Sequence, residues 1–224
     1  MDVSKDQHIK IKLSKSGHKI PIINQIHLHS AYNPIKEAET IFKKNEEQIK
    51  SNANLLVLGL GFGYHVIEFA RNLRSIYGED FKIFVLEPGV EIYNYYLEIN
   101  ETRDPNIAII AGRDIKSIYE DHDLIDFLLK KPAVISHPAS FNLHNDYFTK
   151  FLKYSAPNTL GEISGSMRSR ELKEYIGEYH QDSGFDEFLH TVKEKHIHSE
   201  PLDFFFLALN EITREHDCGG RDNQ

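Results

Sequence analysis

Three glycines at alternate positions carry the clearest chemical signal in the chain. They follow the apolar run Leu55–Leu58 and are Gly59, Gly61 and Gly63. Glycine lets a backbone approach a ligand closely, and the helix after such a turn presents N–H groups to an anion. The next apolar run ends in Glu87, whose carboxylate can hold ribose hydroxyls. This order predicts a binding site for a nucleotide-type small molecule.

The glycine spacing does not identify the ligand. The pattern G-x-G-x-G is shorter than the dinucleotide pattern G-x-G-x-x-G, because Tyr64 stands where the last glycine would be. It is closer to the loop of methyltransferases that bind S-adenosylmethionine. The alternative is a tight turn without a ligand, in which Glu87 is an acid favoured by a helix N-terminus. Replacing Gly61 with a bulky residue is expected to abolish ligand binding while the protein stays folded.

Two further polar residues stand at the ends of predicted strands. Asp114 follows the third strand, where it can contact an adenine ring, although a helix N-cap is the favoured interpretation. His137 follows the fourth strand and can act as a general base or a phosphate contact, or be a structural histidine before proline. His137 is the candidate catalytic residue.

Polar side chains gather just before a predicted helix start. The segment contains His29, Ser30, Tyr32 and Asn33, and we expect it to shape the rim of the pocket. His27 and His29 would face the same way on a strand, an arrangement in which two histidines can bind one metal ion. Because no third ligand has an evident place, we expect no metal site.

Apolar runs alternate with helical patterns over the first two thirds of the chain. This order predicts an α/β, Rossmann-like fold: a mainly parallel sheet with helices on both faces and ligands at the carboxyl ends of the strands. The predicted strands are residues 55–58, 82–86, 106–111 and 133–136, preceded by a β-hairpin of residues 8–13 and 20–23. The predicted helices between them are residues 34–51, 63–76, 89–99 and 114–130.

Only helical patterns follow residue 145. We therefore expect a Rossmann-like domain over residues 1–150 and a helical extension over 151–224, with helices at 146–154, 168–180, 185–196 and 202–216. The last helix carries Phe204–Phe206, a large apolar load. It is expected to pack on the sheet domain, on a domain that follows, or on another chain, in which case the protein is a homo-oligomer.

Composition excludes several classes of protein. The formal net charge of −8 argues against binding nucleic acid. The one cysteine, Cys218, excludes an intrachain disulfide and a cysteine-based zinc site. The sequence has no run of 18 apolar residues of the kind that spans a membrane. Its first twenty residues contain no apolar stretch long enough for a signal peptide, so we expect none. We expect a soluble cytoplasmic protein.

Three segments and one dipeptide together resemble the N-terminal domain of the motility accessory factor (Maf) family. They are Leu28–Ala38, with the specific run HSAYNPIKEA, Val57–His65, Val85–Pro88 and His137-Pro138. The resemblance covers roughly residues 20–150. Members of that family are bacterial proteins implicated in the glycosylation of flagellin with nonulosonic acids. In them a larger domain, thought to carry the transfer chemistry, follows the matching part, and this chain is expected to lack most of it.

The resemblance implies a protein of flagellar or surface glycosylation that binds a nucleotide or a nucleotide-sugar, CMP-linked in particular, with flagellin or another protein as partner. Whether it is a glycosyltransferase stays open. The first alternative is an S-adenosylmethionine-dependent methyltransferase that holds its cofactor with Gly59–Gly63, Glu87 and Asp114. The second is a binding or assembly module without catalysis.

Overall fold

The computed structural model describes residues 9–100 and 103–219. The chain forms two compact units, Met1–Lys153 and Tyr154–Gln224, called here the sheet unit and the helical unit. The sequence places the corresponding division at 150/151. None of the helices within the described residues is long and apolar enough to cross a membrane.

A small antiparallel sheet begins the sheet unit. Strands β1 (Ile9–Leu13) and β2 (Lys19–Ile23) form the predicted hairpin, and a short β3 (Ile26–His27) adds to β2. The predicted start at residue 8 lies outside the described residues. β2 buries Ile20 and Ile23, whereas Ile11 and Leu13 on β1 are exposed. The small sheet is therefore attached to the rest of the unit mainly through β2.

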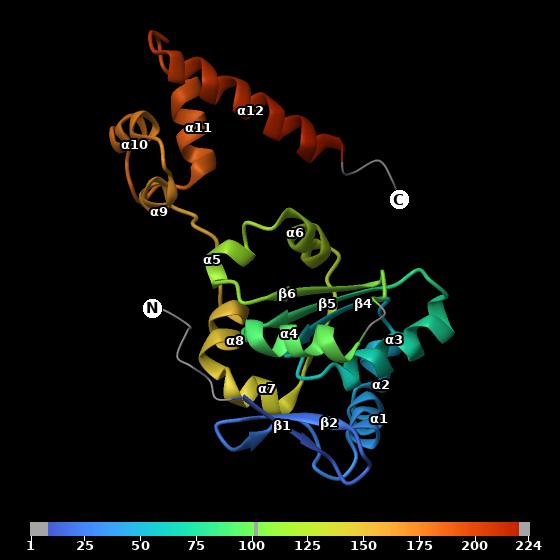
Figure 1. Cartoon of the computed structure of the whole chain (residues 1–224). Helices are drawn as coiled ribbons and strands as arrows, with labels where there is room; N and C mark the ends of the chain where they lie inside the picture. The colour runs from blue at the N-terminus through green and yellow to red at the C-terminus, as the bar shows by residue number, and fades with distance from the viewer. Residues whose placement is uncertain (1–8, 101–102, 220–224) are drawn as a thin grey trace. The chain divides into compact units, whose positions relative to one another are not determined.

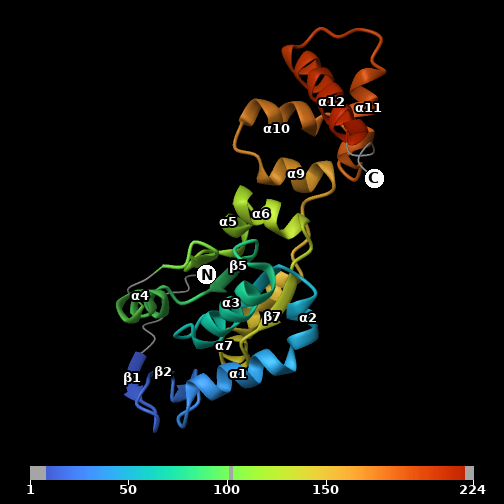
Figure 2. The ribbon, with the colours of Figure 1, turned by 90° about the vertical axis from the view of Figure 1, so that its right-hand side faces the viewer.

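The main sheet is parallel and has the order β6-β5-β4-β7, which confirms the predicted α/β, Rossmann-like architecture (Figures 1 and 2). Its strands are β4 (Asn54–Leu58), β5 (Lys82–Glu87), β6 (Ile107–Ala111) and β7 (Ala133–Ser136). The chain adds β5 and β6 on one side of β4 and then crosses to add β7 on the other. The switch point between β4 and β7 is where such sheets open a crevice at their carboxyl edge.

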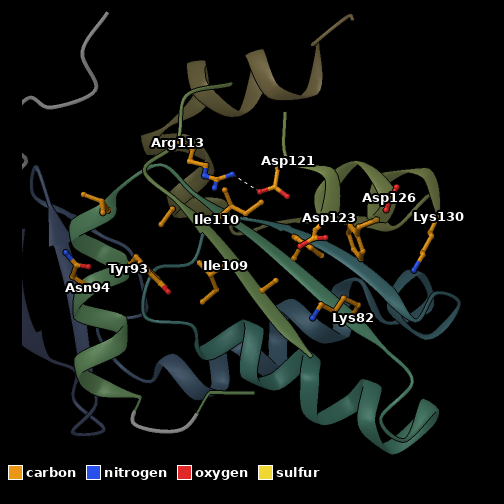
Figure 3. A pocket seen from close by; sticks show the side chains of 15 residues that line it. Lys82, Tyr93, Asn94, Ile109, Ile110, Arg113, Asp121, Asp123, Asp126 and Lys130 are labelled. Atoms are coloured by element: carbon orange, nitrogen blue, oxygen red, sulfur yellow. Dashed lines mark hydrogen bonds and ion pairs between the residues drawn. The ribbon is translucent and has the colours of Figure 1, made fainter. Parts of the chain in front are cut away.

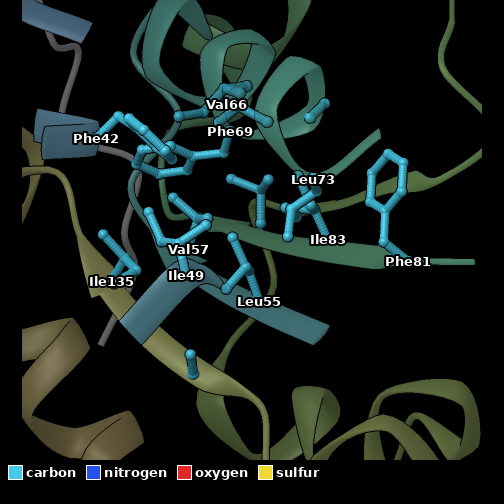
Figure 4. Close-up of a cluster of buried hydrophobic side chains, with 14 of the residues drawn as sticks. Phe42, Ile49, Leu55, Val57, Val66, Phe69, Leu73, Phe81, Ile83 and Ile135 are labelled. Carbon is cyan, nitrogen blue, oxygen red and sulfur yellow. The ribbon is translucent and has the colours of Figure 1, made fainter. Parts of the chain in front are cut away.

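Apolar side chains of the strands alternate between two hydrophobic clusters. Leu55 and Val57 meet α1–α4 on one face (Figure 4), whereas Leu56 and Leu58 meet α5, α6 and α8 on the other. The helices of the sheet unit are α1 (Pro34–Lys44), α2 (Glu46–Lys50), α3 (Tyr64–Tyr77), α4 (Val90–Ile99), α5 (Ile115–Ile118), α6 (His122–Leu129), α7 (Pro138–Leu143) and α8 (Asn145–Leu152). Burial on both faces explains the continuous apolar runs of the strands.

Two predicted helices are each broken in two. The helix predicted over residues 34–51 is interrupted at Asn45, which ends α1 and precedes α2. The helix predicted over 114–130 divides into α5 and α6, and Asp121 caps α6 by accepting from the Leu124 N–H. Helix α7, which begins with Pro138 at its first position, was not predicted. Proline is well suited to that position because its missing N–H needs no partner there.

The helical unit has a hydrophobic core of its own. Its helices are α9 (Leu160–Ser166), α10 (Arg170–Gly177), α11 (Phe185–Lys193) and α12 (Pro201–Gly219), of which α9 was not predicted. Phe206 is buried against Tyr175 and Phe188, whereas Phe204 and Phe205 are about half exposed. The expectation that this apolar triplet packs outside its own unit is therefore wrong for Phe206.

A buried carboxylate fastens the start of α12. One oxygen of Asp203 accepts hydrogen bonds from the Tyr175 hydroxyl at 2.6 Å and the Lys195 ammonium at 2.7 Å. The other accepts from the N–H groups of Ser199 and Glu200, both at 3.1 Å. Burial favours a raised pKa for Asp203, but hydrogen bonds from Lys195 and Tyr175 outweigh it and hold the pKa below its usual range.

Replacing Asp203 with Asn should destabilise the helical unit. An amide has only one acceptor oxygen. Its NH₂ group would replace the second carboxylate oxygen and would face N–H or O–H donors, with which it cannot form hydrogen bonds. We expect the free energy of unfolding to fall by about 2–4 kcal/mol in urea denaturation followed by circular dichroism. Asp182→Asn, at an exposed position of the same unit, is the control and should change it by less than about 0.5 kcal/mol. Equal effects of the two substitutions would contradict the role of Asp203.

Candidate functional site

The glycine loop between β4 and α3 packs against the protein's own side chains. All three glycines have positive φ angles, of 98°, 52° and 77° in chain order. A Cβ atom at Gly59 would lie 2.3 Å from Ser140 Cβ, and one at Gly61 would lie 2.4 Å from His29 Nε2. At Gly63 it would lie 2.4 Å from the Tyr96 ring. Glycine is required here because the rest of the sheet unit approaches the loop closely.

Protein acceptors also occupy N–H groups of this loop. Leu60 N–H donates to Glu87 Oε2 at 2.8 Å, and Phe62 N–H donates to His29 Nε2 at 2.8 Å. Gly59 N–H continues the sheet by donating to the Leu86 carbonyl. In phosphate-binding turns such groups point at the ligand. In this structure they hold the loop to β5 and to the segment before α1.

Glu87 lies beneath the loop with 1% of its surface exposed. Its second oxygen, Oε1, accepts from Gly89 N–H at 2.9 Å, so both oxygens are engaged by backbone donors. Burial raises the pKa of Glu87 to about 7, although hydrogen bonds from Gly89 and Leu60 act in the opposite direction. The predicted ribose-binding acid thus joins the glycine loop to the start of α4.

Asp114 is exposed and caps α5, because its carboxylate accepts from the Ser117 N–H at 3.1 Å. This is the N-cap that the sequence favoured over an adenine contact. These hydrogen bonds hold the pKa of Asp114 below its usual value.

Three histidines meet beside the loop. His29, His65 and His137 are each at most 3% exposed. The rings of His65 and His137 stack with centroids 4.4 Å apart, and the His29 ring lies 4.8 Å from that of His137. Each ring contacts an oxygen through one nitrogen: His29 Nδ1 with Glu37 at 3.3 Å, His65 Nε2 with the Gly59 carbonyl at 3.0 Å, and His137 Nδ1 with the Ser140 hydroxyl at 2.8 Å.

The protonation of this cluster follows from burial. Burial, and then the neighbouring His29, lower the pKa of His65 to about 3, although its hydrogen bond to the Gly59 carbonyl opposes the shift. Burial and the neighbouring histidines also hold the pKa of His137 well below its usual value. Both rings are therefore neutral near pH 7. A lowered pKa makes His137 a weak base, which argues against its predicted role as a general base.

His65 is the residue that the sequence analysis missed. It stands in the first turn of α3, two positions after Gly63, so its place at the carboxyl edge of the sheet could have been inferred. The predicted pair of His27 and His29 is not formed, because His27 is exposed on β3 whereas His29 is buried. Within the described residues, His65 Nδ1 has no hydrogen-bond partner, at a cost of about 1–3 kcal/mol.

Three of the four predicted rim residues come together, whereas His29 is buried and does not line their hollow. Ser30, Tyr32 and Asn33 line a hollow of about 500 Å³, called here the rim hollow, together with Lys36 and His137. Its size falls in the range of small-molecule sites. Ser30 Oγ accepts from the N–H groups of Tyr32 and Asn33, which fixes the shape of the segment. The rim hollow lies next to the carboxyl end of β7, on the side of the switch point.

A larger hollow, about 810 Å³, runs beside β6 (Figure 3). Its wall carries both charges, since Lys82, Arg113 and Lys130 face it together with three aspartates, Asp121, Asp123 and Asp126. Arg113 is paired with Asp121 at 2.6 Å. The aspartates make this hollow a poor site for a phosphate-bearing ligand, despite its size.

Comparison with known proteins leaves the family open. No protein-family model matches the chain, and no curated protein matches it. Among solved structures, MNMC2 from Aquifex aeolicus is similar with a TM-score of 0.37 and 18% sequence identity. The match covers 53% of this chain and 47% of that one, so the chain spans about half the length of the structure it matches. A likeness of this extent carries no argument about ligand or activity.

Gly61→Ala should destabilise the protein more than Gly17→Ala. Both glycines have positive φ, so each substitution costs about 1–2 kcal/mol of backbone strain. A Cβ at Gly17 has open space, whereas one at Gly61 also displaces His29, which adds about 1–3 kcal/mol. Urea denaturation measures the difference. This corrects the expectation that a bulky residue at Gly61 leaves the fold intact. Equal losses in the two variants would mean that the loop is not closely packed.

Acid should destabilise the sheet unit. Unfolded histidine binds a proton below about pH 6.5, but folded His65 and His137 do not, so their contribution to stability is present above that pH and lost below it. Glu87 opposes this, because its raised pKa makes the folded state bind a proton. On unfolding, the two histidines take up two protons and Glu87 releases one, so the unfolded state binds one proton more. The free energy of unfolding should therefore fall by about 1.4 kcal/mol for each pH unit between about 6.5 and 5. Urea denaturation at several pH values, with a chelator present, measures this change. A free energy of unfolding that increases as the pH is lowered through this range would contradict the neutral state of His65 and His137.

Proposed function

We propose that the sheet unit binds a phosphate-bearing, nucleotide-type small molecule in the rim hollow. The observation that carries the proposal is the position of this hollow. It lies next to the carboxyl end of β7, the strand that borders the switch point on one side, and open parallel sheets bind their ligands at this carboxyl edge. The glycine loop then supports the site by its shape and does not cradle the phosphate.

The chemistry of the rim hollow suits such a ligand. Lys36 and Lys44 of α1 are exposed cations on its wall. Glu37 also belongs to the wall, but its Oε2 already accepts from the Ser30 N–H and contacts His29. Tyr32 is 66% exposed, and since the Lys15 ammonium lies over one face of its ring, 4.2 Å from the centroid, the opposite face is the one on which a base can stack. Together these groups provide cations for a phosphate and a ring for a base.

The resemblance to the Maf family favours a nucleotide-sugar, CMP-linked in particular, and a place in flagellin or surface glycosylation in the cytoplasm. The exposed side chains of the rim hollow would then bind and orient the sugar donor. The methyltransferase alternative has less support, because both oxygens of Glu87 are already engaged by backbone donors.

Lys36→Ala and Tyr32→Ala should weaken nucleotide binding without unfolding the protein. Thermal shift is measured with CMP, CMP-sugars, UDP-sugars, NAD and S-adenosylhomocysteine, since a ligand that binds the native state raises Tm by mass action. Loss of one cation-to-phosphate contact should weaken affinity about tenfold. Lys43→Ala, on the same helix but outside the rim hollow, is the matched control.

The panel also separates the alternatives. A shift with CMP or UDP compounds that Lys36→Ala reduces and Lys43→Ala preserves supports the proposal. A shift with S-adenosylhomocysteine that neither lysine variant changes would place the ligand elsewhere and favour a methyltransferase. The absence of any shift at high ligand concentration would contradict nucleotide binding and leave the binding-module alternative.

A further inference from the structure

The three buried histidines offer one ligand nitrogen each, and these nitrogens all lie within 4.8 Å of one another. They come from three parts of the chain: His29 precedes α1, His65 belongs to α3, and His137 follows β7. We propose that these three residues bind a late first-row divalent metal ion such as zinc. The inference is independent of nucleotide binding, because it rests on the imidazoles alone.

The second nitrogens of the rings support this assignment. In metal sites, a ligating histidine almost always directs its other ring nitrogen to a carboxylate, a carbonyl or another oxygen, which fixes the tautomer. All three rings have such a contact, to Glu37, to the Gly59 carbonyl and to the Ser140 hydroxyl. These contacts set the tautomer of each ring and leave each of the three residues with one nitrogen that can ligate.

His65 provides an independent observation. Its Nε2 faces the Gly59 carbonyl, which can only accept, so Nε2 carries the hydrogen and Nδ1 keeps a free lone pair. In the described part of the chain this Nδ1 is buried without a hydrogen-bond partner. A buried polar atom without a hydrogen-bond partner is rare in proteins, so this one points to a bound partner such as an ion. A metal ion in the cluster would satisfy it.

The ligand set selects the class of metal. Three neutral imidazoles suit zinc, copper, nickel or cobalt, whereas magnesium and calcium require oxygen ligands. Burial keeps His65 and His137 neutral near pH 7, the form that ligates. Three protein ligands leave a fourth position for water or substrate. Because His137 also lines the rim hollow, a metal held here would lie next to it.

Binding requires local adjustment. Zinc–nitrogen bonds of about 2.0–2.1 Å in a tetrahedron place ligand atoms about 3.4 Å apart, closer than the present limit of 4.8 Å. The rings of His65 and His137 are nearly parallel, at 7°, so one of them must turn for both lone pairs to meet one ion. His29 Nε2 must also release the Phe62 N–H. Metal binding should therefore alter the glycine loop.

The test uses the full chain, stripped with a chelator and titrated with Co²⁺ and Zn²⁺, with no nucleotide present. Visible absorption of Co²⁺ reports tetrahedral nitrogen ligation, and calorimetry with Zn²⁺ gives the stoichiometry. The variants are His65→Gln, whose amide can still donate to the Gly59 carbonyl, and His137→Asn, whose amide can still donate to Ser140. Circular dichroism checks that they fold. The controls are His27→Gln and His144→Asn, outside the cluster.

We expect one tight site per chain, intense Co²⁺ absorption bands and a raised Tm with Zn²⁺ but not with Mg²⁺. His65→Gln and His137→Asn should each weaken binding about a hundredfold or more, whereas the two controls should not change it. The proposal is overturned if the wild-type protein shows no Co²⁺ bands, or if folded cluster variants bind as the wild type does. If both variants fail to fold, the wild-type absorption and stoichiometry decide alone.

Discussion

The contact between the glycine loop and His29 is the constraint on which the candidate site depends. Phe62 N–H donates to His29 Nε2, and Gly61 has no side chain that would separate the two. This contact fastens the segment between β3 and α1 to the carboxyl edge of the main sheet. Ser30 follows His29 directly, so the same contact holds the rim segment beside His137. The shape of the rim hollow therefore depends on the absence of a side chain at Gly61.

The loop is held from two sides by acceptors that differ in charge. Glu87 accepts from Leu60 from the side of β5, and His29 accepts from Phe62 from the side of α1. An anion arriving at these N–H groups would have to displace an internal acceptor that is already desolvated. The G-x-G-x-G pattern serves here to pack a loop closely, and the proposed ligand site is therefore the rim hollow and not the loop.

The main sheet could be predicted because buried parallel strands are continuous apolar runs, as Leu55–Leu58 shows. The helix breaks were missed because Asn45 and Asp121 stand inside patterns whose apolar spacing continues across them. The function of Gly61 could not be predicted, since it depends on His29, 32 positions earlier in the chain. Ser30, Tyr32 and Asn33 could be grouped from the sequence because they are close in it, but the burial of His29 could not be foreseen. Helix α9 could have been found, as Thr159 and Glu162 form a capping box.

The two proposed sites would affect each other if both are occupied. Neutral imidazoles leave a bound divalent ion with its full charge, and that charge would lie next to the rim hollow because His137 belongs to both. In a partly buried setting, a nearby phosphate would be attracted more strongly than in water. By linkage, this electrostatic attraction would strengthen metal binding by the same factor, whereas release of the Phe62 N–H from His29, which holds the rim segment, would act against it. Without a ligand, the positive charge of the metal ion would repel the ammonium groups of Lys36 and Lys44. A bound phosphate would be attracted to the ion and to the lysines and would reduce this repulsion.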